Sequence, residues 1–148
     1  MDALRISTDR DELDVGMVHR FLAEDAYWSR GIPRDVVERA IAGSLCFGGY
    51  LEGAGQVAFG RVVTDSATFG YLADVFVLPA HRGHGHGHGR TLVAAMLAHP
   101  QLRGLRRLML ATSDAHGLFA GFGFEAAGPG KLMEIVHPDP YRTAPAAA

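Results

Sequence analysis

Cysteine is nearly absent from this sequence of 148 residues, in which Cys46 is the only one. A lone cysteine excludes a disulfide within the chain and is typical of proteins from a reducing compartment. No apolar run approaches the roughly 18 residues that a membrane-spanning helix requires, and the N-terminus lacks the apolar core of a secretory signal. We therefore expect a cytoplasmic protein without a membrane partner.

Lysine is also scarce, and positive charge is not in excess. Lys131 is the single lysine among 14 basic residues, which face 16 acidic ones and give a formal net charge of −2. This balance gives no electrostatic reason to expect binding to nucleic acid or to an anionic membrane. The chain has the length of one domain. We expect a single domain over residues 1–148, with a disordered tail from about residue 143 to residue 148.

Apolar periodicity predicts an alternation of strands and helices. Three strands follow one another directly after the second helix, and a later helix separates them from the next strand. This order indicates a mixed, mostly antiparallel sheet flanked by helices, of the α/β (α+β) class, rather than a doubly wound parallel sheet. The predicted strands are 4–8, 45–52, 56–65, 68–79, 106–112 and 132–137, and the predicted helices are 11–28, 33–44, 89–99 and 114–124.

The segment HRGHGHGHGR, residues 81–90, lies between a predicted strand and a predicted helix. Its glycines let the chain turn without Cβ clashes, so that successive backbone N–H groups can face one surface. The start of the helix adds unpaired N–H groups and the positive end of its dipole. Such a corner binds phosphate without charged side chains. The segment is not a Walker A loop, because no Gly-Lys-Ser/Thr follows.

Two stretches resemble the signature motifs of the GNAT superfamily of acyl-CoA-dependent N-acyltransferases. VFVLPAHRGHGHGHGRTL is similar to V-x-P-x-x-R-G-x-G-x-G, and the later TSDAHGLFAGFGF is similar to N-x-x-A-x-x-L-Y-x-x-x-G-F. The resemblance implies a GNAT-like sheet of about 6–7 strands with about four helices. It also implies acetyl-CoA as co-substrate, no metal requirement, and direct attack of an acceptor amine on the thioester.

The resemblance further implies which residues bind acetyl-CoA. In this family the strand before the glycine run splays from its neighbour and pairs with the pantetheine arm, while the glycine run holds the pyrophosphate. The implied cofactor-binding residues are Val75, Phe76, Val77, Arg82, Gly83, His84, Gly85, His86, Gly87, His88, Gly89, Arg90, Thr112 and Phe119.

Three departures from the family pattern concern the same site. The glycine run is one Gly-His unit longer, so the three family glycines match either Gly83, Gly85 and Gly87 or Gly85, Gly87 and Gly89. Thr112 stands at the family's asparagine position. Phe119 stands where a tyrosine is commonly proposed to protonate the departing thiolate, and phenylalanine cannot donate a proton.

Two residues are candidates for proton transfer. Asp74 could take a proton from the amine, directly or through water, or it could be a polar residue on the solvent side of a strand. His116 could replace the missing acid, although a surface histidine is the plainer interpretation. Asp114 is expected to cap the short helix.

The acceptor amine is expected to bind beside the segment EDAYWSRGIPR, which joins the first two predicted helices. Tyr27, Trp28 and Arg30 could line its pocket. Aromatic residues at a helix end are also common core residues.

Two other classes of function stay open. A CoA-binding sensor without catalysis is favoured by Phe119 and Thr112. A metal-binding protein is suggested by His84, His86 and His88, which an extended segment would aim to one side. The expected partners are acetyl-CoA and a small amine or peptide amine, and the protein is expected to be a monomer or a homodimer.

Overall fold

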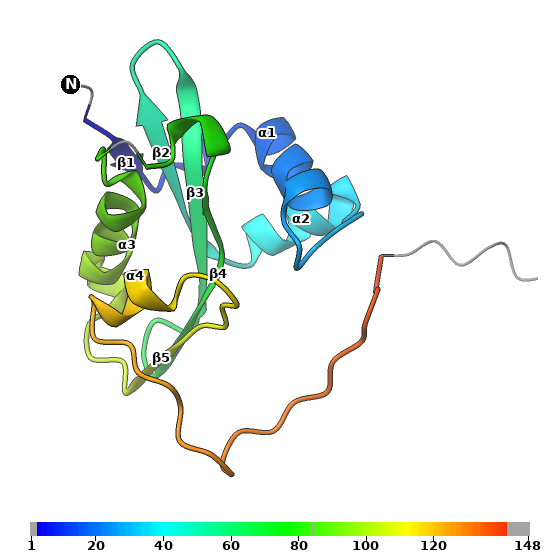
Figure 1. Ribbon diagram of the computed structural model, residues 1–148, viewed down its shortest axis with the longest axis vertical. Helices are drawn as coiled ribbons and strands as arrows, with labels where there is room; N and C mark the ends of the chain where they lie inside the picture. The colour runs from blue at the N-terminus through cyan, green and yellow to red at the C-terminus, as the bar shows by residue number, and fades with distance from the viewer. Residues whose placement is uncertain (1–2, 84, 142–148) are drawn as a thin grey trace, which may run out of the picture.

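The computed structural model describes residues 3–83 and 85–141, so His84 and the predicted tail at 143–148 lie outside the described residues. The described residues form one mixed sheet of five strands in chain order (Figure 1). Neighbouring strands are antiparallel except for β4 and β5, which are parallel, as the element order predicted. The strands are β1 (Arg5–Ser7), β2 (Leu45–Leu51), β3 (Gly55–Thr64), β4 (Phe69–Val77) and β5 (Arg107–Met109).

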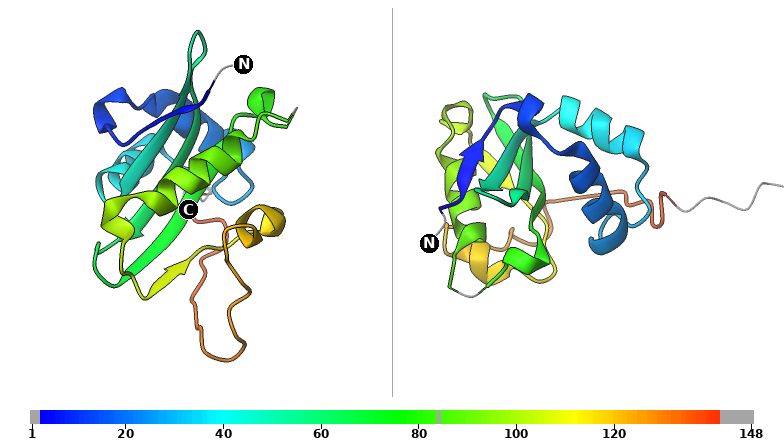
Figure 2. Two further views of the ribbon diagram at one scale, coloured as in Figure 1. Left: turned by 90° about the vertical axis from the view of Figure 1, so that its left-hand side faces the viewer. Right: turned by 90° about the horizontal axis from the view of Figure 1, so that it is seen from above.

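Helices cover both faces of the sheet (Figures 1 and 2). α1 (Val15–Arg20) and α2 (Arg34–Ala42) lie on one face, and α3 (His88–Ala98) and α4 (His116–Ala120) lie on the other. In the described part of the chain, none of the helices has the length and apolar character needed to span a bilayer. The four α-helices α1 to α4 confirm the prediction of about four helices.

The first helix is shorter than the predicted 11–28. Asp14 caps it, because its carboxylate accepts a hydrogen bond from the Met17 N–H at 3.0 Å. After Arg20 the chain continues as one π-helical turn, Phe21–Asp25, and then leaves the helix at Ala26. This early end frees residues 26–33 to form the loop that borders the site described below.

Each face of the sheet has its own hydrophobic core, because successive side chains of a strand point to opposite faces. Phe47, Ala58 and Val77 pack with α3 on one face. Their sequence neighbours Cys46, Phe59 and Phe76 pack with α1 and α2 on the other. The central strands β2 and β3 are buried on both sides, which explains their almost continuous apolar sequences.

A β-bulge interrupts β4 at Asp74. The register with β3 passes from Phe59 opposite Phe76 to Arg61 opposite Ala73, so β4 contains one extra residue there. Asp74 adopts a left-handed conformation with φ +54°. Aspartate tolerates this region better than most residues, and an extra residue of this kind bends a strand and re-aims its side chains. The bulge lies where β4 turns away from β5.

The chain after Phe124 does not form the predicted strand 132–137. Residues 125–141, here called the arm, run as an extended bow outside the sheet (Figure 1). Met133 is 97% exposed and Ile135 is 87% exposed. Among residues 3–83 and 85–141 the sheet has five strands, so the prediction of about 6–7 is wrong there: the apolar residues that suggested a further strand have no neighbouring strand in this part of the chain.

Candidate active site

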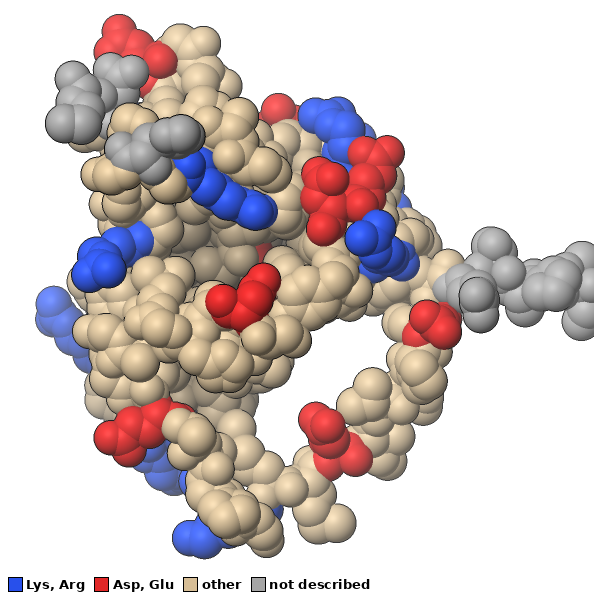
Figure 3. Space-filling view, in the orientation of Figure 1, with Lys and Arg blue, Asp and Glu red and all other residues tan. Residues whose placement is uncertain are grey.

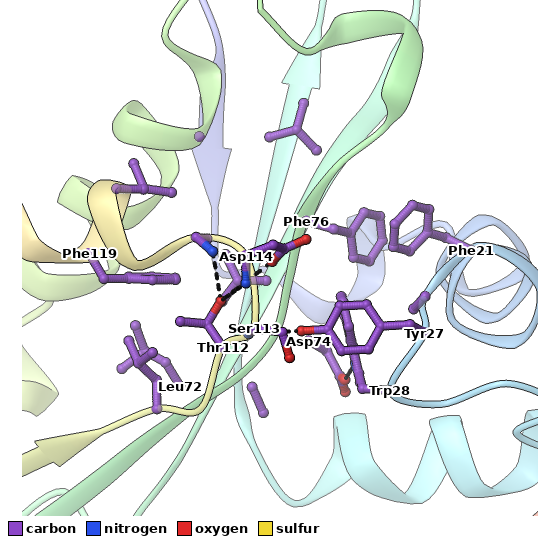
Figure 4. A pocket seen from close by; sticks show the side chains of 18 of the residues that line it. Phe21, Tyr27, Trp28, Leu72, Asp74, Phe76, Thr112, Ser113, Asp114 and Phe119 are labelled. Carbon is purple, nitrogen blue, oxygen red and sulfur yellow. Dashed lines mark hydrogen bonds between the residues drawn. The ribbon is translucent and has the colours of Figure 1, made fainter. Parts of the chain in front are cut away.

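A cavity of about 950 Å³ lies where β4 and β5 separate. The two strands pair only from Phe69 opposite Arg107 to Tyr71 opposite Met109, although β4 continues to Val77. The edge of β4 from residue 72 onward is therefore unpaired on this side and lines the cavity (Figure 4). Val75, Phe76 and Val77 all line it, at the splayed strand that the sequence resemblance implied.

The glycine run closes one end of the cavity at the start of α3. Gly87 adopts φ +67°, and the first helical hydrogen bond runs from the Thr91 N–H to its carbonyl. The N–H groups of His88, Gly89 and Arg90 are therefore left without helical partners and are available to an anion. These three residues line the cavity together with Gly83 and Gly87, whereas Gly85 and His86 do not.

Two side chains organise this end of the cavity. Arg82 donates a hydrogen bond from Nε to the Val77 carbonyl at 2.6 Å, which ties the glycine run back to the end of β4. His88 is buried, and burial lowers its pKa, with smaller contributions from His86 and His81. The lowered pKa favours the neutral imidazole, which stacks on that of His86 with 5.2 Å between ring centroids.

Asp74 faces the opposite end of the cavity with both oxygens engaged. Trp28 Nε1 donates to Oδ1 at 2.8 Å (Figure 4). Arg61 Nε donates to Oδ2 at 2.7 Å. Arg61 also donates from Nη1 to Ser44 Oγ at 3.0 Å. The Asp74 and Arg61 side chains are only 12% and 18% exposed, so this pair is poorly screened by solvent. Each carboxylate oxygen keeps a lone pair for a further donor.

Tyr27 connects two loops across the cavity. Its hydroxyl accepts a hydrogen bond from the Ser113 N–H at 3.1 Å, and its ring packs edge-on against Trp28 (Figure 4). Tyr27, Trp28 and Tyr141 all line the cavity. Two of the three predicted acceptor residues are thus at the site. The third, Arg30, is exposed and does not line the cavity, because its guanidinium donates to the Glu24 carbonyl at 3.1 Å.

The segment after β5 places Thr112 and Phe119 on the cavity but not His116. The Thr112 hydroxyl accepts hydrogen bonds from the N–H groups of Ala115 at 3.0 Å and Asp114 at 3.4 Å. Thr112 therefore accepts the hydrogen bonds of the N–H groups just before α4. The Asp114 side chain makes no capping hydrogen bond, so the prediction that Asp114 caps this helix is wrong. Phe119 is 7% exposed and packs edge-on against Phe124. His116 is exposed and lies outside the cavity lining, so it is not placed to protonate a thiolate there.

Sequence reasoning missed Arg61 and Tyr141. A single charged residue inside the apolar strand QVAFGRVV is a signal that could have singled out Arg61, since a buried guanidinium needs a partner. No sequence pattern singles out Tyr141, because only the path of the arm in three dimensions brings it to the cavity. Among residues 3–83 and 85–141, no group of three or more histidine, cysteine or acidic side chains is arranged to hold a metal ion.

Comparisons with known proteins agree with this architecture. The family model described as "Acetyltransferase (GNAT) family" matches residues 15–124. A curated protein of Gibberella zeae, named as a candidate acetyltransferase, is 37% identical over an aligned length of 135, and the match covers 77% of this chain and 74% of that protein.

Solved structures extend the likeness to three dimensions. A Xanthomonas campestris protein, described as a candidate acetyltransferase of the GNAT family, is 53% identical with a TM-score of 0.91, covering 97% of this chain and 99% of the other. A Clostridium acetobutylicum protein, described as an acetyltransferase with acetyl-CoA, shares the fold at 15% identity, with a TM-score of 0.66 and coverage of 92% and 96%. With most of its length matched by the family model, this chain belongs to the GNAT acetyltransferase family.

Proposed function

We propose that this protein transfers an acetyl group from acetyl-CoA to an amine by direct attack. The observation that carries the proposal is that the unpaired edge of β4 and the free N–H groups of α3 lie on one continuous cavity. An extended amide-bearing chain can pair with the strand edge while its phosphates reach the helix start. The pantetheine and pyrophosphate of acetyl-CoA have this combination of groups.

The cofactor half of the cavity would hold CoA as follows. The pantetheine amides pair with the backbone of Val75–Val77, and the pyrophosphate accepts hydrogen bonds from the N–H groups of His88, Gly89 and Arg90. Gly89 faces Val77 and Leu118, since a Cβ on Gly89 would lie within 4.0 Å of both side chains. Gly89 also lies in the first turn of α3 with its N–H free of a helical partner, which favours Gly85, Gly87 and Gly89 as the three family glycines.

The acceptor half is formed by Tyr27, Trp28, Asp74 and Tyr141. Asp74 supplies negative charge, and its free lone pairs can hold the water that takes a proton from the incoming ammonium. The aromatic side chains cover the apolar part of an amine and can contact its cationic form through their faces. The class of acceptor that these residues suit is an amine attached to an apolar or aromatic group.

In the reaction, the neutral amine nitrogen attacks the carbonyl carbon of the thioester. A C–N bond forms, the C–S bond breaks, and the electron pair leaves with the CoA sulfur as a thiolate, while the proton that the new amide nitrogen loses passes to water or to that thiolate. Backbone N–H groups near Val77 stabilise the negative charge that develops on the carbonyl oxygen. Phe119 cannot protonate the sulfur, so the thiolate departs as an anion or takes a proton from water. A thiolate can leave without a proton from the protein because free thiols ionise near pKa 8.5.

The test is calorimetric titration with acetyl-CoA followed by thioester turnover with a panel of amines. We expect micromolar binding, an upward shift of the melting temperature by mass action, and acetylated amine as product. Absence of binding at millimolar acetyl-CoA would refute the proposal.

A catalytically inactive CoA sensor is the second candidate, because Phe119 and Phe124 close the usual acid position with an apolar contact. Tight CoA binding without acetyl transfer to any amine in the panel would select the sensor instead.

A further inference from the structure

The acceptor half of the cavity contains a guanidinium group that is only partly hydrogen-bonded. Arg61 lines the cavity, and its side chain is largely buried. Its Nε donates to Asp74 Oδ2 at 2.7 Å and its Nη1 donates to Ser44 Oγ at 3.0 Å, whereas no described residue accepts a hydrogen bond from Nη2. A buried N–H group gains stability from an acceptor, so Nη2 is a binding group for an anionic oxygen of a ligand.

Arg61 belongs to the acceptor half and not to the phosphate-binding end of the cavity. It lies on β3, opposite Ala73 and beside the bulge that carries Asp74. The other two arginines among the described lining residues, Arg82 and Arg90, lie at the glycine run and in the first turn of α3. An anionic group bound at Arg61 would therefore be part of the acceptor and not of CoA.

Arg61 and Asp74 present charges of opposite sign next to each other. Their side chains are largely buried, so solvent screens the field of the pair only weakly. The pair has no net charge, and a ligand with a positive charge alone is attracted by Asp74 and repelled by Arg61. A ligand that carries an amine and a carboxylate side by side is complementary to both groups.

The other charged residues of the cavity do not override this local arrangement. Apart from two histidines, they are the acidic Asp25 and Asp114 and the basic Arg82 and Arg90, whose formal charges cancel. Figure 3 shows acidic and basic side chains interspersed on the face of the molecule drawn there. Since no single sign dominates, the ion pair decides which charges a ligand must carry.

The surface beside the ion pair is aromatic. Tyr27 and Trp28 lie next to Asp74 and remain partly exposed (Figure 4). Phe21 stacks on Phe76 with 3.9 Å between ring centroids, and both rings are buried in the wall of the same cavity. These rings offer apolar contact area and no charge, so they suit an apolar or aromatic side chain.

We infer that the acceptor half binds an amino acid with an apolar or aromatic side chain as the acetyl acceptor. Its amino nitrogen lies at Asp74, its carboxylate accepts a hydrogen bond from Arg61 Nη2, and its side chain packs against Trp28. An amine and a carboxylate attached to one carbon atom can engage both members of an ion pair whose nearest atoms are 2.7 Å apart. The acetyl transfer itself rests on the proposed function and gives an N-acetyl amino acid and CoA by the same bond changes.

Matched pairs of acceptors test the role of the carboxylate in the unaltered protein. L-phenylalanine, L-tryptophan and L-leucine are compared with phenethylamine, tryptamine and isoamylamine, which lack only the carboxylate. After correction for the fraction of each amine that is neutral, we expect kcat/KM to be at least about tenfold higher for an amino acid than for its partner. Transfer to the three amines that equals or exceeds transfer to the amino acids would overturn the inference and leave the proposed function standing.

Calorimetric titration with the same six compounds, with and without CoA, does not depend on turnover. We expect an amino acid to bind at least about tenfold more tightly than its partner. Preferential binding of an amino acid without acetyl transfer would support the binding site and refute the proposed function. Binding of none of the six compounds, or equal binding within every pair, would overturn the inference.

Arg61→Gln tests which residue recognises the carboxylate, because glutamine keeps a donor for Asp74 and removes the positive charge. We expect kcat/KM to fall at least about tenfold more for the amino acid than for its partner amine. Arg20→Met removes a guanidinium that is exposed at the end of α1 and outside the cavity lining, and it should leave the preference unchanged. An equal loss for both members of a pair in Arg61→Gln would show that Arg61 only supports Asp74. The comparison in the unaltered protein decides the inference if this variant does not fold.

Discussion

At the scale of single residues, Phe119 stands where the sequence resemblance implies a tyrosine that protonates the departing thiolate. Its ring is buried on the cavity wall, and Phe124 lies 5.8 Å away between ring centroids. Phe119→Tyr should place a phenol near the departing sulfur. It should raise kcat by about 10²-fold, which is within the rate contribution of a positioned general acid. The affinity for acetyl-CoA should change little, because the proton is needed only as the thiolate leaves. Steady-state kinetics and calorimetry measure the two effects.

The control for this substitution is Phe124→Tyr, which adds the same hydroxyl on a neighbouring ring that does not line the cavity. It should leave kcat unchanged. Both variants can lose about 1–3 kcal/mol of stability if the hydroxyl is buried without a partner. Equal rate changes in the two variants would show that the phenol at position 119 does not act on the sulfur.

Asp74 is the second residue whose role can be separated by substitution. Asp74→Asn keeps a side chain that tolerates φ +54° but removes the charge that faces Arg61. If Asp74 takes the amine proton through water, kcat/KM at neutral pH should fall about 10²-fold. The defect should shrink at a pH where the amine is already neutral. A pH–rate profile with one amine measures this.

Trp28→Phe is the companion variant, because it removes the indole donor and leaves the carboxylate in place. It should raise the KM of the amine without changing the pH profile. A rate defect in Asp74→Asn that is constant with pH would instead make Asp74 a positioning residue.

At the scale of elements, the proposed CoA complex depends on the first turn of α3, where the glycines that meet the pyrophosphate can be distinguished by substitution. Gly89 is helical, and a Cβ there would lie 3.8 Å from Leu118 Cδ2, an ordinary contact. Gly89→Ala should therefore fold normally, yet lose about tenfold in CoA affinity, or roughly 1.4 kcal/mol, because the methyl group faces the cavity. Calorimetry with CoA and thermal unfolding measure the two quantities.

Gly83→Ala is the matched comparison at the other end of the run. Gly83 has φ +69° and no neighbour within 4 Å of an added Cβ, so the substitution costs about 1–2 kcal/mol of backbone strain and leaves CoA binding nearly unchanged. If Gly83→Ala lost CoA affinity and Gly89→Ala kept it, the glycines that meet the phosphates would be Gly83, Gly85 and Gly87.

At the scale of the whole molecule, two buried groups in β2 set the alkaline limit of stability. Burial raises the pKa of Cys46 from 9.0 to about 11 and that of Tyr50 from 10.0 to about 12. A group whose folded pKa is raised stabilises the fold below its unfolded pKa, and this contribution is lost as pH rises through the folded value. The free energy of unfolding should therefore fall above pH 9, first through Cys46 and then through Tyr50.

Urea unfolding at several pH values measures this decline, with Cys46→Ala as the comparison. Because alanine does not ionise, the variant should lose less stability than the unaltered protein between pH 9 and pH 11. Parallel declines in the two proteins over that interval would mean that Cys46 does not contribute to it.

Local patterns in the sequence were sufficient to predict the family, the order of the elements as far as α4 and the position of the glycine-rich helix start that we propose binds phosphate. Periodicity of two or 3.6 residues depends on the chain itself, so the antiparallel strands and α3 were predicted near their observed bounds. The glycine run could be assigned to a helix start for the same reason, because its strand and helix are its neighbours in sequence.

Only the tertiary structure decided which side chains meet across the cavity. The bulge at Asp74 depends on how β4 registers with β3, and the pairing of Asp74 with Arg61 and Trp28 joins residues far apart in the chain. The same holds for Tyr27 with Ser113 and for Tyr141 at the cavity wall. The arm makes the point most clearly: its residues have the composition of a strand, but a strand exists only where a second edge is present to pair with it.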